Sequence, residues 1–322
     1  MPPPVTVVAC CAVILWALLL ASAYFLQASR TAAQDVAGMV SARYAVSEAP
    51  LSLEATAWSG ISFDTSTEHP VPAHYVLENG VPRSLPFALV SFVDFMQVPV
   101  SIAGREDLVH RLEAPASTAV ASRFEVPAPS VGAHDQIQLL VWEPDRHSVS
   151  MEWRISTVDG WFTANRTRLV AGDSSATPSY AAPTVEGVVD TMGFDGVLTN
   201  RSATQVGDLW TAETVAPAAL VPFYVHVGNA APRARTFALV ALMDWRQTTF
   251  TASGSKVVFL SVPAGQTATL SGVILAPVSA GVHEFQVFRF EDPYDPVGAA
   301  GKTTSGSATI ACGARLALEV AP

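Results

Sequence analysis

The sequence predicts an all-β protein in which two tandem antiparallel β-sandwich domains follow an N-terminal transmembrane helix. Three observations support this fold class. Residues 71–97 and 221–247 align without a gap at an offset of 150 residues, which indicates a duplicated module. Short apolar or alternating segments, separated by turn residues, recur in both halves of the chain, as is typical of sandwiches. Residues 5–28 carry no charged side chain.

The uncharged N-terminal run would span roughly 36 Å as a helix, which is enough to cross a bilayer. Its length favours a retained anchor over a cleaved signal, although an Ala-Ser-Ala sequence leaves cleavage after Ala23 open. We therefore expect residues 1–28 to be a transmembrane anchor or an uncleaved signal. Residues 29–49 are rich in alanine and end before Pro50, so we expect a helical stalk there.

The first sandwich is assigned to residues 50–172. Its clearest central strand is residues 87–95, an apolar run bounded by prolines, which predicts a strand covered on both faces. Residues 118–126 alternate between apolar and polar side chains, as in a half-buried strand. The remaining expected strands are residues 51–58, 71–77, 135–142, 150–156 and 161–170, the last two joined by a hairpin turn at Asp159-Gly160.

A linker rich in serine, proline and alanine is expected at residues 173–194, and the second sandwich at residues 195–322. The turn at 263–265 predicts a hairpin between the two strands that flank it. The sequence pattern also matches Arg315, in the last strand, to Arg168 of the first repeat. The expected strands are residues 219–227, 236–245, 257–262, 267–275, 283–290 and 308–320.

Three stretches of the second repeat carry a resemblance to a known class of modules. They are VPFYVHVGN, VPAGQTATL and HEFQVFRF, and they resemble strands of bacterial immunoglobulin-like or fibronectin-type-III-like surface modules. The similarity covers most of both repeats and lies in the pattern alone, because the Cys–Trp–Cys signature of antibody-type domains is absent. The resemblance implies a sandwich fold and a role in spacing, adhesion or assembly outside the cell, but a fold does not fix a function.

Composition excludes one class of partner. The net charge is −10 and the basic residues form no cluster, so recognition of a nucleic-acid backbone is not expected. The three cysteines do not allow a disulfide within either sandwich, because Cys10 and Cys11 lie in the N-terminal run and Cys312 stands alone. No sequence motif for a cofactor, a zinc site or a catalytic serine is present, and we expect no catalytic residues and no cofactor.

Two pairs of polar residues recur in the repeats and are candidates for a binding site. Asp94 and Gln97 follow the central strand of the first repeat, and Asp244 and Gln247 follow that of the second. The structural alternative is that these side chains satisfy backbone groups where the strand ends. A turn containing Asn79 and its counterpart in the second repeat is expected to be structural in both copies.

Two further sets of residues are weighed as binding sites. Trp153 and Trp161 bracket the expected hairpin and would stack on a sugar if both were exposed, although tryptophan in a sandwich more often lies in the core. Glu291, Asp292 and Asp295 are candidate Ca²⁺ ligands, but their spacing matches no known calcium loop. Solvated loop acids are the structural alternative, and no metal is expected.

These observations predict a single-pass protein of the cytoplasmic membrane whose two sandwiches lie outside the cytoplasm, at the cell surface or in a periplasm. Its expected role is structural or interactive, in adhesion, envelope assembly or a membrane complex, without catalysis. The expected partners are the lipid bilayer, through residues 5–28, an unidentified protein, and further copies of the chain. Two alternatives stay open: a carbohydrate-binding module pair, and a filament subunit assembled through the N-terminal helix.

Overall fold

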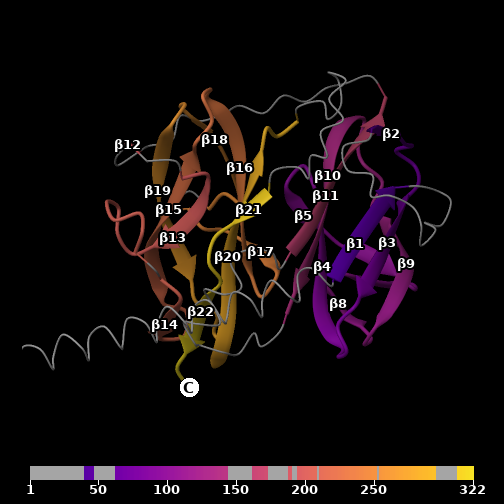
Figure 1. Ribbon diagram of the computed structural model, residues 1–322, viewed down its shortest axis with the longest axis horizontal. Helices are drawn as coiled ribbons and strands as arrows, with labels where there is room; N and C mark the ends of the chain where they lie inside the picture. The colour runs from indigo at the N-terminus through magenta and orange to yellow at the C-terminus, as the bar shows by residue number, and fades with distance from the viewer. Residues whose placement is uncertain are drawn as a thin grey trace, which may run out of the picture.

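The computed structural model describes residues 40–46, 62–143, 162–172, 188–190, 194–208, 210–251, 254–294 and 310–322. Within these residues the chain forms strands and connecting loops and contains no helix. The strands build four sheets, and each repeat contributes two of them (Figure 1). The all-β prediction is therefore confirmed for the described part of the chain.

The first repeat folds into two sheets, which we name outer sheet 1 and inner sheet 1 by their position relative to the second repeat. Outer sheet 1 has the order β1 (Val40–Val46), β3 (Val71–Asn79), β9 (Thr118–Val126), β6 (Val100–Ile102) and β7 (Arg105–Asp107). Inner sheet 1 has the order β2 (Ser62–Asp64), β11 (Phe162–Ala171), β10 (Gly132–Trp142), β4 (Leu85–Val93) and β5 (Met96–Val98), and β8 (His110–Ala114) also pairs with β4.

The second repeat has the same arrangement. Outer sheet 2 has the order β12 (Val188–Asp190), β19 (Gln266–Leu275), β15 (Leu220–Asn229) and β13 (Gly196–Asn200). Inner sheet 2 has the order β14 (Ala212–Val215), β22 (Leu316–Val320), β20 (Gly281–Glu291), β16 (Arg235–Met243) and β17 (Arg246–Thr248). Two more strands join this sheet, β18 (Val257–Val262) beside β16 and β21 (Ile310–Cys312) beside β20.

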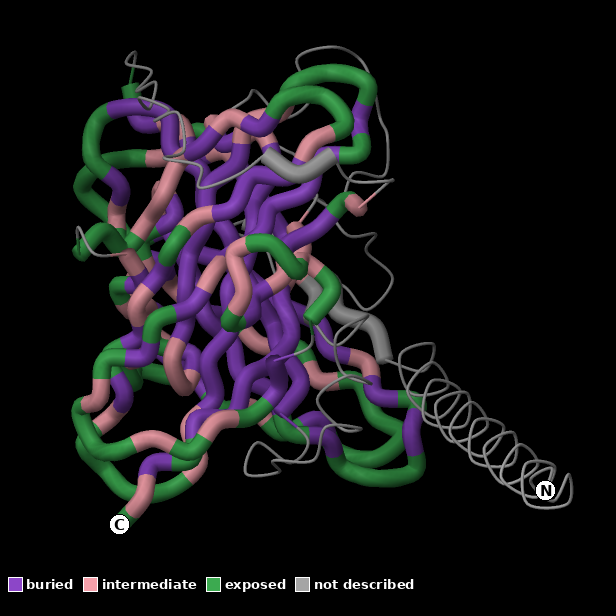
Figure 2. Tube along the Cα trace, turned by 90° about the vertical axis from the view of Figure 1, so that its left-hand side faces the viewer, coloured by how far each residue is buried: buried purple, intermediate pink, exposed green. Residues whose placement is uncertain are grey.

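Each sandwich encloses a core of its own, and a third core lies between the two inner sheets. Because side chains alternate across a strand, β4 directs Leu89 into the first sandwich and Val90 toward the second repeat. The inner sheets lie against each other in Figure 1, and Figure 2 shows buried residues running through the middle of the molecule. The prediction that residues 87–95 form a strand covered on both faces is confirmed, with the strand ending at Val93.

The structure corrects three predictions of local structure. The sandwiches are not wholly antiparallel, because β2 runs parallel to β11 and β14 runs parallel to β22. β18 and β19 do not form a hairpin: β18 pairs with β16 and β19 pairs with β15, so their connection crosses from one sheet to the other. Part of the expected helical stalk is strand β1, which pairs with β3 over its whole length.

The last strand also differs from expectation. The predicted strand at residues 308–320 is divided into β21 and β22, which pair with different parts of β20. Strand register then changes one match between the repeats. Leu316 pairs with Phe285 in the second repeat, and Thr167 pairs with Gln136 at the same place in the first. Arg315, the residue before Leu316, therefore corresponds to Arg166. The sequence-based match of Arg315 to Arg168 is wrong by two residues, a shift that keeps the side chain on the same face.

Several predictions fall outside the described residues. They concern the apolar run 5–28, the expected strands at 51–58 and 150–156, and the hairpin turn at 159–160. Among the residues that the structure describes, no helix is long and apolar enough to cross a membrane.

Candidate functional site

The two repeats meet through aromatic side chains placed by matching turns. Asp94 and Phe95 form the two-residue turn between β4 and β5 with φ of 52° and 65°, and Asp244 and Trp245 form the turn between β16 and β17 with φ of 49° and 67°. Positive φ at both positions is the geometry of a type I′ hairpin turn. Bulky residues rarely adopt it, so the complete burial of the Phe95 ring indicates that packing holds the turn in place.

Gln97 and Gln247, both candidate binding residues, hydrogen-bond to each other's backbone across this interface. The Gln97 N–H donates to Gln247 Oε1 at 2.7 Å, and the Gln247 N–H donates to Gln97 Oε1 at 2.6 Å. The side-chain amides continue the exchange: Gln97 Nε2 donates to the Trp245 carbonyl and Gln247 Nε2 to the Phe95 carbonyl, each at 2.8 Å. The contact is therefore close to two-fold symmetric, and both amides are used within the protein.

Two buried arginines repeat the same symmetry. Arg166 pairs with Asp135 of its own repeat at 2.5 Å and donates to the Glu291 carbonyl of the other repeat at 3.0 Å. Arg315 pairs with Glu284 at 3.1 Å and donates to the Trp142 carbonyl at 2.5 Å. Both guanidinium groups thus link a buried carboxylate in one repeat to the backbone of the other. Sequence analysis missed the role of both arginines because the backbone groups that they contact in the other repeat are 125 and 173 residues away along the chain.

Asp94 and Asp244 each complete a Ser–His–Asp contact that the spacing in the sequence did not reveal. In the first repeat, His134 Nδ1 lies 2.6 Å from Asp94 Oδ2, and His134 Nε2 lies 3.4 Å from Ser130 Oγ. In the second repeat, the corresponding distances are 2.7 Å and 3.3 Å.

The environment of the histidine argues against nucleophile activation. Nε2 of His134 lies closer to the Ser130 carbonyl oxygen, at 3.0 Å, than to the hydroxyl, and the copy in the second repeat shows the same order at 2.9 Å. A carbonyl accepts a hydrogen bond, so Nε2 faces it as a donor, whereas a general base must accept the hydroxyl proton there. The Asp94 carboxylate also accepts the Asp135 N–H at 3.1 Å. Each set therefore joins a turn to the start of the next long strand.

A pocket of about 480 Å³ opens where the two repeats meet, and it contains two of the candidate residues. Arg246 reaches from the second repeat to Asp107 of the first at 3.1 Å. The Val109 N–H first, and after it the Leu108 N–H and the Arg246 guanidinium, hold the pKa of Asp107 below its usual value, although desolvation opposes the shift. The lining residues are Val109, Arg111, Met243, Asp244, Arg246, Gln247 and Thr248.

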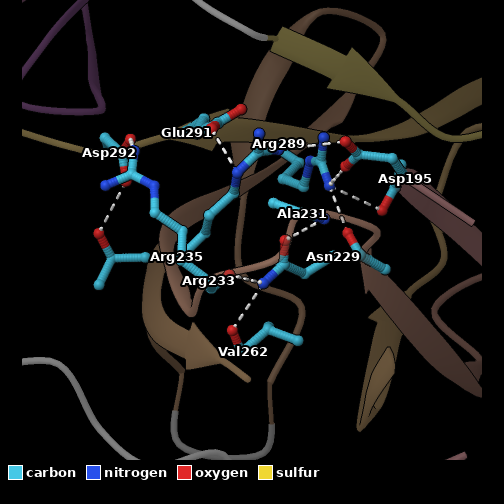
Figure 3. Close-up of polar contacts among 12 residues, drawn as sticks. Asp195, Asn229, Ala231, Arg233, Arg235, Val262, Arg289, Glu291 and Asp292 are labelled. Atoms are coloured by element: carbon cyan, nitrogen blue, oxygen red, sulfur yellow. Dashed lines mark hydrogen bonds and ion pairs between the residues drawn. The ribbon is translucent and has the colours of Figure 1, made fainter. Parts of the chain in front are cut away.

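The candidate calcium ligands belong to a network of ion pairs in the second repeat (Figure 3). Glu291 pairs with Arg235 at 2.9 Å and Asp292 with Arg233 at 3.6 Å. The same network extends to Asp195, which pairs with Arg235 at 3.1 Å and with the buried Arg289 at 2.8 Å. Three guanidinium groups neutralise the three carboxylates, so the network offers no net negative charge to attract a divalent cation.

Asp295, the third candidate calcium ligand, lies outside the described residues, as do Trp153 and Trp161. Within the described part of the chain, no group of three or more histidine, cysteine, aspartate or glutamate side chains is arranged to hold a metal ion. Asn79 behaves as expected of a turn residue: its side-chain amide donates to the Arg83 carbonyl at 2.8 Å, and Asn229 makes the same contact with Arg233 at 2.9 Å.

No family model matches the sequence, and no curated protein is significantly similar to it. Among solved structures, the CARDB domain of a Pyrococcus furiosus protein, determined in complex with di-metal ions, is 11% identical over 44% of this chain and 95% of its own, with a TM-score of 0.27. Red sea bream transglutaminase is 12% identical over 88% of this chain and 31% of its own, with a TM-score of 0.21.

A third similar structure is the C-terminal domain of the AgI/II polypeptide BspA from Streptococcus agalactiae. It is 8% identical over 87% of this chain and 100% of its own, with a TM-score of 0.21. All three TM-scores lie below 0.5, so these likenesses carry no argument about the function of this chain.

Proposed function

We propose that this chain is a membrane-anchored structural or interaction protein whose two immunoglobulin-like sandwiches act outside the cytoplasm as one rigid unit. The observation that carries the proposal is the third core, which lies between the repeats and contains fourteen buried apolar residues. Domains within a chain move relative to each other unless their interface is large and apolar. A shared core of this kind fixes the spacing and orientation of both outer sheets, as a spacer or scaffold requires.

The anchor in this proposal is the uncharged run at residues 5–28, which is long enough to cross a bilayer. A rigid unit on a single anchor presents its outer sheets and loop ends to a protein partner at a fixed distance from the membrane. The Ser–His–Asp contacts support a non-catalytic role, because each histidine faces a carbonyl with the nitrogen that a general base would use.

Protease treatment of intact cells tests the location. Expressed at full length, the sandwiches should be digested from outside, and the mature chain should retain residues 1–28 by mass spectrometry. A variant lacking residues 1–28 is the control and should remain inside the cell and escape digestion. Protection of the full-length chain that ends only when the cytoplasmic membrane is broken would contradict an extracytoplasmic location.

A distance measurement tests the rigid unit. Spin labels at Arg123 and Ser271, two exposed and corresponding positions on the outer sheets, should give one narrow distance distribution. A broad distribution in the unaltered background would contradict the scaffold role. Native mass measurement in mild detergent separately distinguishes a monomer from a filament subunit.

A further inference from the structure

The pocket between the repeats breaks the two-fold symmetry of the interface at two residues. Arg111 lies opposite Ala88 in the first repeat, and the residue in the same register of the second repeat, opposite Ala238, is Phe259. Arg246 is the first residue of β17, and its counterpart at the start of β5 is Met96. One side of the interface therefore carries two guanidinium groups where the other side carries apolar side chains.

The other side is filled by aromatic packing. Phe259 lies against Phe95 and Tyr294, with ring centroids 5.8 Å and 6.2 Å away. On the arginine side, a pocket of about 480 Å³ lies at this position, within the size range of small-ligand sites. The replacement of packed rings by arginines is thus accompanied by open space.

The hydrogen-bonding groups left free in this pocket are donors. Arg111 uses Nε in its pair with Glu143, and Arg246 uses one terminal nitrogen in its pair with Asp107; within the described part of the chain their other N–H groups have no hydrogen-bond partner. The acceptors are occupied: Asp244 pairs with His283 and accepts the Glu284 N–H.

The Thr248 hydroxyl of the pocket wall donates to the Thr249 carbonyl at 3.4 Å, and the side chain of Gln247, the remaining polar group, is also in use. Its oxygen accepts the Gln97 N–H and its nitrogen donates to the Phe95 carbonyl. Val109 and Met243 supply the apolar part of the pocket wall. The pocket thus offers cationic donors set around a small apolar surface.

We propose that this pocket binds a compact carboxylate ligand, with its carboxylate groups on Arg111 and Arg246. Guanidinium groups bind carboxylates through paired, charge-assisted hydrogen bonds, which favours this anion over a spherical one. The carboxylates of Asp107 and Glu143 pair with the two arginines, Asp244 lines the pocket, and the protein carries a net charge of −10, so a long polyanion would be repelled. A small dicarboxylate, or the carboxyl terminus of a peptide, offers a carboxylate to the guanidinium groups and is not a long polyanion.

Calorimetric titration of the full-length chain in detergent tests the proposal, with succinate, citrate and a short peptide in carboxylate and amide forms as probes. Binding of succinate or citrate would identify a free carboxylate as the ligand, and binding of the acid peptide but not its amide would identify a polypeptide terminus. In either case Arg246→Met, which inserts the counterpart residue of the first repeat, should weaken binding about tenfold or more.

Met96→Ala, on the other side of the interface, is the matched control and should leave the affinity unchanged. Arg111→Met is a second variant that should also weaken binding about tenfold. Thermal unfolding of each variant establishes whether it is folded. Arg246→Met should cost little stability, because both members of its pair with Asp107 are accessible to solvent, whereas Arg111→Met should cost more, because it leaves the buried Glu143 without one of its donors. The proposal is overturned if the unaltered chain binds none of the probes, or if Arg246→Met and Arg111→Met bind as tightly as the parent.

Discussion

The interior of the first sandwich contains a polar patch that makes a sharp prediction about stability. The patch lies on the face of inner sheet 1 that also carries Leu89, Leu140 and Leu169 into the first core. Its members are Ser91, Gln136, Gln138, Asn165 and Thr167, which strand pairing places in neighbouring rows. All five are buried, and seven of their side-chain polar atoms have no hydrogen-bond partner among the described residues.

The second repeat shows that the fold does not require this patch. The residues in the same register there are apolar, and the four that belong to the second core are Ala241, Phe285, Val287 and Leu316, with Ala314 beside them. We therefore expect the double substitution Gln138→Val and Asn165→Ala, which inserts the residues of the second repeat, to stabilise the protein. Most substitutions of buried residues have the opposite effect.

The magnitude follows from the atoms removed. Three of the unpartnered atoms belong to Gln138 and Asn165, and relief of each contributes at least about 1 kcal/mol. The smaller side chains lose packing, which subtracts roughly 1–2 kcal/mol. The net gain in the free energy of unfolding is then about 1–2 kcal/mol, equivalent to a rise in Tm of roughly 2–8 °C for a unit of this size.

Calorimetric and denaturant-induced unfolding of the full-length chain in detergent measure this change. The matched control is Val287→Gln in the second repeat, which buries an amide in an apolar core and should destabilise the protein by about 1–3 kcal/mol. A double variant less stable than the parent would refute the reasoning, because it would show that the polar atoms have partners that stabilise the native state.

Three further predictions concern the interface, the pH dependence and a close backbone approach. Gln97→Ala and Gln247→Ala should each cost about 1–3 kcal/mol of unfolding free energy, and the double variant should cost less than their sum; additive costs would show that the two side chains do not interact. Burial lowers the pKa of His226, although a hydrogen bond with a backbone carbonyl opposes the shift. The unfolded chain then binds more protons, so stability should be complete above about pH 6.5 and fall as the pH drops below it, and His226→Gln should flatten this slope in pH-dependent melting curves. A Cβ at Gly272 would lie 2.5 Å from a buried phenylalanine ring, so Gly272→Ala should destabilise the second repeat by about 1–3 kcal/mol, whereas Gly207→Ala, which meets no atom within 4 Å, should be neutral in the same assay.

The sequence pattern was sufficient to predict an all-β chain and its main strands. The expected strand at residues 118–126 has the bounds of β9, and the apolar run at 87–95 indicated a strand covered on both faces. Which strands pair with each other was harder to predict from the sequence. The turn at 263–265 has hairpin chemistry, but the same residues also suit a connection between two sheets, and only the packing of β18 beside β16 decides between them.

The junction between the repeats could be predicted only in part. The recurrence of Gln97 and Gln247 identified two residues that hydrogen-bond across it, and the recurrence of Asp94 and Asp244 identified the turns that precede them. Their partners could not be predicted, since single-sequence patterns carry no information on which distant strands face each other. For the same reason Arg111, which lies between His110 and Leu112 on a short edge strand, gave no signal of the pocket.

The sequence differences between the two repeats favour a contact between one first and one second repeat over a contact between two identical repeats. Trp245 donates its ring N–H to the buried Glu143 at 2.5 Å across the interface. The counterpart of Trp245 in the first repeat is Phe95. The counterpart of Glu143 in the second repeat is Asp292, because the Glu143 N–H donates to the Pro86 carbonyl and the Asp292 N–H donates to the carbonyl of Thr236 at the same place. Two first repeats would set Phe95 against Glu143 and leave a buried carboxylate without this donor, which is costly. Two second repeats would set Trp245 against the shorter Asp292. Only a first repeat packed on a second repeat sets Trp245 against Glu143. The specificity of this contact therefore comes from the cost of packing two identical repeats as well as from the contact itself.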